Sequence, residues 1–224
     1  MGINDWPEDQ RPRERLIKQG AQVLSDAELI AVFLRVGVRG KSAVDLGRDM
    51  IAHFGSLHAL FSASMQDFSK IHGLGNAKFA QLQAVLELAK RAISEQLQTS
   101  SSLSSPEAVR HFLKLSIGNK EYESFHVLFL DVKNRLIKAE ELFKGTLSHA
   151  SIYPREVIKA ALTHNAASVI LAHNHPSGSC EPSQADITLT ATLKAALHCV
   201  DIRLLDHFIV AKSDVYSMAE HGEV

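Results

Sequence analysis

The sequence predicts a small helical domain, residues 1–99, followed by an α/β domain, residues 107–224, with a mixed sheet and flanking helices. Two observations lead to this fold class. Up to about residue 98, apolar residues recur at helical spacing. After the Ser/Thr-rich stretch QLQTSSSLSSP, short apolar runs typical of strands alternate with amphipathic helical segments. We interpret residues 100–106 as the linker between the two domains.

Helix signals organise the first domain. SDAELIAVFLRVG has Ser25 at an N-cap position, Glu28 three residues later and Gly37 at its end, which predicts a capped helix. A glycine also ends the next amphipathic stretch. A glycine-containing break, HGLG, divides the last apolar stretch into two helices. The expected helices cover residues 25–37 and 44–54, and two lie within 65–93.

In the second domain, strands and helices are expected to alternate. Helices over residues 105–115 and 154–165 each place a proline at or near the first position, where its missing N–H is tolerated. A third helix is expected over residues 185–200. Strands are expected over residues 124–132, 136–145, 168–175, 202–211 and 214–220.

Composition narrows the class of protein. The formal net charge is -1, so the chain is not a strongly basic nucleic-acid-binding module. Its two cysteines, Cys180 and Cys199, form no CxxC pair, which excludes a cysteine-rich zinc site and fits a reducing compartment. We find no apolar run of roughly 18 residues and no signal-peptide pattern in MGINDWPEDQRPRERL, so a cytoplasmic protein without membrane spans is expected.

LAHNHPSGSCEPSQAD, residues 171–186, contains a candidate metal site. His173 and His175 are two residues apart at the end of an apolar strand, so their side chains lie on the same face. Asp186 falls in the first turn of the next helix and can fold back over that face. Two imidazoles and one carboxylate suit zinc and leave a fourth position for water. Ser183 and Asp186 also have the spacing of a capping box, so the spacing alone leaves metal ligand and helix cap open.

HNHPSGSCEPSQAD resembles the H-x-H-P-x(n)-S-x-x-D signature of the JAMM (MPN+) metallopeptidases. Together with LLDHFIV near the C-terminus, LAHNHPSG resembles the RadC family (UPF0758) in particular, over nearly the whole chain. The resemblance implies a JAMM fold and one zinc ion held by His173, His175 and Asp186. It also implies hydrolysis of a peptide, an isopeptide or another amide, with the substrate itself not indicated.

The same resemblance implies two catalytic residues. A general-base glutamate belongs at the start of the first core strand, where ESFHVLFLD places Glu123, and Ser183 would stabilise the oxyanion. The competing explanation for Ser183 is a helix cap alone. Asp206-His207 either orients a metal ligand or is structural. The other glutamates considered for the base are Glu121, Glu140, Glu141 and Glu156.

IHGLGNAKFAQL, residues 71–82, resembles a helix-hairpin-helix turn. The backbone N–H groups of Gly73 and Gly75 and the Lys78 ammonium would contact a DNA phosphate, giving weak, sequence-independent binding. Alternatively, the glycines only allow two helices to pack closely. Two functions therefore stay open: a zinc-dependent amide hydrolase, and a DNA-associated repair or scaffold protein. No pattern indicates an oligomeric state.

Overall fold

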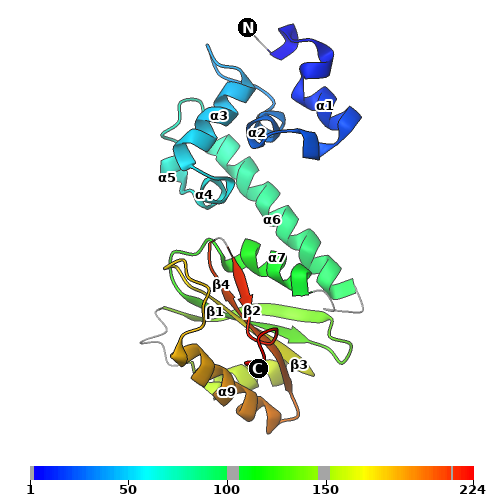
Figure 1. Ribbon diagram of the computed structural model, residues 1–224, viewed down its shortest axis with the longest axis vertical. Coiled ribbons are helices and arrows are strands. Elements are labelled where there is room, and N and C mark those ends of the chain that lie inside the picture. Colours follow the sequence, from blue (N-terminus) through cyan, green and yellow to red (C-terminus); the bar gives the residue numbers. More distant parts are fainter. Residues whose placement is uncertain (1–2, 100–105, 146–151, 213) are drawn as a thin grey trace. The chain divides into compact units, whose positions relative to one another are not determined.

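A computed structural model describes residues 3–99, 106–145, 152–212 and 214–224 (Figure 1). The chain divides into two compact units, Met1–Glu87 and Leu88–Val224. The division falls inside one long helix, α6 (Asn76–Thr99). Leu82 lies in the core of the first unit, and Leu97 lies in a core of the second. The packing partners of α6 thus change within the helix, whereas the sequence predicts a boundary near residue 100. The expected linker lies outside the described residues except for Pro106.

The first unit is helical, as the sequence predicts. A serine side chain accepts a hydrogen bond from the third backbone N–H of each of four helices, α2 to α5. Because an N-cap serine satisfies a backbone donor that the helix leaves free, these serines fix where the helices begin. The helices are α1 (Pro12–Gln19), α2 (Asp26–Leu34), α3 (Ala43–Phe54), α4 (Leu57–Ser62), α5 (Met65–Phe68) and α6, with 3-10 turns at Ile3–Asp5, Glu8–Gln10 and Ala21–Val23.

The end of α2 differs from the expectation. Its capping box between Ser25 and Glu28 is present. The helix ends at Leu34, however, and not at the predicted Gly37. Arg35 itself adopts a positive φ of 66° and donates its backbone N–H to the Ala31 carbonyl, so the helix is closed before the glycine is reached.

The second unit is a mixed five-stranded sheet of order β2-β1-β3-β4-β5, with helices packed on both faces. The pairs β1–β2, β1–β3 and β4–β5 are antiparallel, and β3–β4 is parallel. In the described residues, no helix is both long and apolar enough to cross a membrane. The elements are α7 (Pro106–Ile117), β1 (Ser124–Leu130), β2 (Leu136–Lys144), α8 (Pro154–Thr163), β3 (Ser168–Asn174), α9 (Gln184–His198), β4 (Arg203–Val210) and β5 (Val215–Ser217).

Alternation along the buried strands creates two apolar layers. On β1, Leu128 and Leu130 pack with α7, whereas Val127 and Phe129 pack on the opposite face with α8 and α9. Figure 1 shows α7 and α9 on opposite sides of the sheet. Because both faces are covered, a polar side chain on β3 must find a partner within the protein. This requirement decides how the polar residues at the end of β3 are arranged.

Candidate metal centre

The end of β3 and the start of α9 bring the three predicted ligands together. His173 is the penultimate residue of β3 and is fully buried, and His175 follows the strand. The backbone N–H of His175 donates to the Val210 carbonyl at 2.9 Å, which extends the strand pairing beyond Asn174. Asp186, 1% exposed, lies in the first turn of α9. One ligand atom from each residue lies within 4.8 Å of the others.

The distances between the ligand atoms fit a small metal ion. The two Nε2 atoms of His173 and His175 are 3.0 Å apart. Asp186 Oδ1 lies 3.1 Å from His173 Nε2, and Asp186 Oδ2 lies 3.6 Å from His175 Nε2. A tetrahedral ion with bonds of about 2.0–2.1 Å separates its ligand atoms by about 3.3–3.4 Å. The three observed spacings, of which one involves each carboxylate oxygen of Asp186, lie on either side of that value.

Hydrogen bonding on the far side of His175 supports the same conclusion. His175 Nδ1 lies 2.9 Å from the Ser179 carbonyl oxygen, which only accepts, so Nδ1 carries a proton. In the neutral ring, Nε2 then has a free lone pair that faces His173 Nε2 and the Asp186 carboxylate. Lone pairs converging in this way repel one another unless a proton or a cation lies between them. The donor set therefore suits a metal ion.

The charges in the cluster shift two pKa values. Burial by itself raises the pKa of Asp186, but its contacts with the His173 and His175 imidazoles outweigh burial and hold that pKa well below its usual range. The contact with Asp186 raises the pKa of His175 against the opposing effect of burial, and the nearby charge of Glu123 adds to the rise. Without a metal, protonated His175 thus partly compensates the buried carboxylate.

Ser183 is the N-cap of α9. Its hydroxyl donates to Asp186 Oδ2 at 2.6 Å, and its backbone N–H donates to the same oxygen at 2.7 Å. In return, the backbone N–H of Asp186 donates a hydrogen bond to Ser183 Oγ. This is the complete capping box that the spacing indicated. The cap and the candidate ligand set coexist, because Oδ2 serves the cap while Oδ1 faces His173. Capping thus fixes the carboxylate of Asp186 in place.

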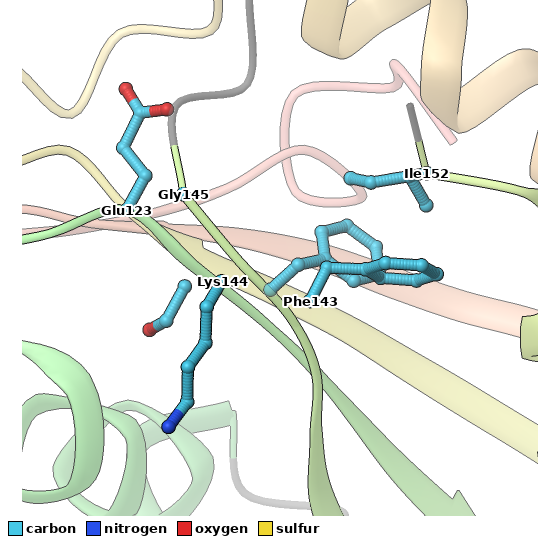
Figure 2. A pocket seen from close by; sticks show the side chains of 7 residues that line it. Glu123, Phe143, Lys144, Gly145 and Ile152 are labelled. Atoms are coloured by element: carbon cyan, nitrogen blue, oxygen red, sulfur yellow. The ribbon is translucent and has the colours of Figure 1, made fainter. Parts of the chain in front are cut away.

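Glu123 lies next to this cluster. β1 and β3 pair antiparallel with Phe125 opposite His173, and continuing that register by two residues sets Glu123 opposite His175. Directly opposite residues have side chains on the same face of a sheet. Figure 2 shows the Glu123 side chain leaving the strand on the opposite side from Lys144, beside an apolar depression lined by Phe143 and Ile152.

Three of the four competing glutamates contact a basic side chain other than the proposed metal ligands. Glu140 pairs with His164 at 3.1 Å, and Glu141 pairs with Lys120 at 2.8 Å. Glu156 pairs with its exposed neighbour Arg155. Glu121, the fourth, is exposed. Of the five glutamates, Glu123 is the one whose charge contributes to the raised pKa of His175.

Asn174, between the two histidines, was not singled out from the sequence. Its side chain is 2% exposed and points to the opposite face of β3. Its Oδ1 accepts from the Ser124 N–H and hydroxyl at 2.8 and 2.9 Å, and its Nδ2 donates to the Lys120 and Tyr122 carbonyls. Asn174 thereby fixes the segment that carries Glu123. A polar residue inside a fully buried strand was the available signal.

His207 of β4 lies behind His173, where sequence left its role open. His173 Nδ1 is 2.9 Å from His207 Nε2, and His207 Nδ1 is 2.6 Å from Thr190 Oγ1. Burial lowers the pKa of His207 well below its usual value. Asp206 points elsewhere: its carboxylate accepts from Ser217 Oγ at 2.6 Å and from backbone N–H groups. Of the pair, His207 alone contacts the cluster.

The predicted hairpin turn joins α5 to α6 in the first unit. Gly73 has a φ of +88°, and a Cβ there would lie 2.0 Å from Val38 Cγ1, so the fold itself requires this glycine. Gly75 differs: in the described chain, no atom lies within 4 Å of where its Cβ would stand. Lys78 Nζ donates to the Gly73 carbonyl at 3.0 Å. Packing therefore explains Gly73 but not Gly75.

Comparison with known proteins agrees with this architecture. Residues 3–80 match the UPF0758 N-terminal family, and residues 103–223 match the RadC-like JAB domain family. UPF0758 proteins of Janthinobacterium sp. (strain Marseille) and Herminiimonas arsenicoxydans are each 68% identical over the full length of both chains. One from Nitrosomonas eutropha is 57% identical over 99% of both. The chain therefore belongs to the UPF0758 family and carries a RadC-like JAB domain.

Proposed function

We propose that the chain is a zinc-dependent hydrolase that cleaves an amide bond in a peptide or isopeptide substrate. One observation carries the proposal: two imidazole nitrogens and a carboxylate converge at 3.0 to 3.6 Å. A nitrogen-rich donor set favours zinc over magnesium or calcium, which prefer oxygen ligands. Glu123 beside the cluster supplies a base, which a purely structural metal site does not need.

The chemistry follows from the position of each side chain. His173, His175 and Asp186 would hold the zinc, which would supply Lewis acidity and lower the pKa of a coordinated water toward ~7. Glu123 accepts the proton of the attacking water and delivers it to the leaving amine. The Ser183 hydroxyl donates a hydrogen bond to the oxyanion of the tetrahedral intermediate. To do so, it must first break its hydrogen bond to Asp186 Oδ2.

A substrate panel tests the proposal. Purified protein is incubated with fluorogenic peptides and with peptides joined through a lysine side chain, and amine release is measured. Hydrolysis should disappear after treatment with a chelator and return with zinc, but not with magnesium. An activity that survives full removal of the metal would exclude this mechanism.

Zinc affinity is expected to depend on pH through His175. Ligation requires the neutral ring, and the pKa of His175 is raised above its usual ~6.5. Affinity should therefore fall as the pH is lowered through that raised pKa. In the metal-free protein, the stabilisation by protonated His175 is fully present below ~6.5 and is lost as the pH rises through the raised pKa. Asp186 contributes above ~3.9, and its contribution is lost as the pH falls through its lowered pKa.

Zinc affinity and metal-free stability should thus change in opposite directions as the pH rises from ~6.5 through the raised pKa of His175. Chelator competition measures the first, and urea unfolding of metal-free protein measures the second. Raising the pH should tighten zinc binding and lower the stability that depends on His175. Metal-free His175→Gln provides the control, because its stability should lack that component. Equal zinc affinity below and above the raised pKa of His175 would contradict its assignment as a ligand.

A second candidate function, weak binding to the DNA backbone, is favoured by Gly75. Its glycine identity has no packing explanation, and its open position near the start of α6 allows a phosphate to approach the backbone. Titration with duplex DNA at several salt concentrations tests this role, with Lys78→Ala as the variant. Binding should weaken steeply with salt and decrease in the variant. Absence of binding at about 50 mM salt would exclude it.

A further inference from the structure

A continuous line of contacts runs behind the proposed metal ligands through three elements, β3, β4 and α9. It begins at His173 on β3, passes through His207 on β4 and reaches Thr190 on α9. From Thr190 Oγ1 it ends 2.6 Å from the carbonyl oxygen of Asp186. The side chains are buried, with 0, 0 and 1% exposure. The line thus connects two of the three proposed ligands from the side away from the metal.

The direction of each hydrogen bond follows from the last contact. A carbonyl oxygen only accepts, so Thr190 must donate its single hydroxyl proton to Asp186 O. A thioether, Met218 Sδ, lies farther from Thr190 Oγ1, at 3.5 Å, and is a weak acceptor. With its proton committed, Thr190 Oγ1 must accept from His207 Nδ1 at 2.6 Å. His207 therefore carries its proton on Nδ1.

This arrangement fixes His173 as well. Both ring nitrogens of His207 are occupied by these contacts, and with the proton on Nδ1 its Nε2 accepts. The proton in the 2.9 Å contact then belongs to His173 Nδ1. In the neutral ring, His173 Nε2 is left with its lone pair toward His175 and Asp186. This is the tautomer that metal ligation requires.

The opposite direction is inconsistent with the geometry. If His207 donated from Nε2, its Nδ1 would be an acceptor facing Thr190. The hydroxyl would then lie 2.6 Å from two acceptors, His207 Nδ1 and Asp186 O, with one proton for both. It would also put the proton of neutral His173 on Nε2, where a metal must bind.

We infer that His207 and Thr190 are positioning residues that hold His173 in its metal-binding tautomer and lock the first turn of α9 onto the sheet. The inference rests on the proposed metal site and extends it to residues that do not touch the metal. Phe125 packs against both imidazoles, with ring centroids 6.5 Å from His173 and 5.8 Å from His207. Its apolar ring shields one side of this line of contacts from water, which would compete for these hydrogen bonds.

Thr190→Val tests the inference, because valine keeps the shape and removes the hydroxyl. Thr192→Val is the matched control: Thr192 lies on the same helix, makes the same bond to a carbonyl four residues earlier, at 2.8 Å, and is exposed. The zinc dissociation constant is measured by chelator competition. Thr190→Val should bind about 10–100-fold more weakly. Thr192→Val should match wild type, and Thr190→Ser should recover most of the affinity.

A second measurement needs no variant. Long-range ¹⁵N–¹H spectra of metal-free wild type distinguish the imidazole tautomers, and at a pH where the rings are neutral His173 and His207 should both carry the proton on Nδ1. His173 protonated on Nε2 alone would overturn the inference, as would unchanged zinc affinity in folded Thr190→Val. Failure of wild type to bind zinc would instead reject the proposed function, and with it the role of His207 and Thr190 in metal binding.

Discussion

Glu123→Gln is expected to lower the rate of amide hydrolysis by about 10²–10⁴-fold while zinc remains bound. Glutamine keeps the size of the side chain but cannot accept a proton. The variant should therefore fail at proton transfer and not at metal binding. Turnover of the best substrate and zinc content, measured on the same preparation, separate these effects.

Glu121→Gln is the control for this experiment. It makes the same chemical change two residues away, at an exposed side chain. Its rate should equal that of wild type. If Glu123→Gln kept nearly full activity, or if both variants lost it equally, Glu123 would not be the base. Loss of zinc in Glu123→Gln would show that the residue supports the metal site itself.

Asp186→Asn is expected to weaken zinc binding by more than about a hundredfold, beyond the effect of residues that only support a ligand. The amide oxygen can still accept from the Ser183 backbone N–H, so the cap of α9 is retained. The amide nitrogen then faces His173 Nε2 and places a donor where a metal needs an acceptor. Charge and geometry both oppose binding.

The chain offers a matched control for the cap. Ser42 and Asp45 form the same capping box at the start of α3, in the first unit, and neither belongs to the ligand set. Asp45→Asn should change stability only through its own capping box and leave zinc affinity unchanged, as measured by urea unfolding and chelator competition. Zinc bound as tightly by Asp186→Asn as by wild type would remove Asp186 from the ligand set.

Local patterns were sufficient to predict most elements and the three converging side chains. Strand alternation puts His173 and His175 on one face, and the Ser183 cap fixes Asp186 at the next helix start. Both are relations between residues close in sequence. The helix signals likewise located α3 and its end at Gly55, which adopts a left-handed φ of 77°.

The supporting residues could not be assigned from local pattern because their contacts join distant segments. Asn174 holds a segment 50 residues earlier, and His207 meets His173 across 34 residues. Only the pairing of β3 with β1 and β4 creates these contacts. The division within α6 was hidden for a related reason: the helix continues unbroken while its packing partners change.

The metal content of wild-type protein, purified without chelators under reducing conditions, tests the central claim most directly. Elemental analysis beside His173→Ala should find about one zinc per wild-type chain and none retained in the variant. A folded wild-type protein that binds no zinc even when the ion is supplied would contradict the hydrolase proposal, and DNA binding would then be the function to pursue.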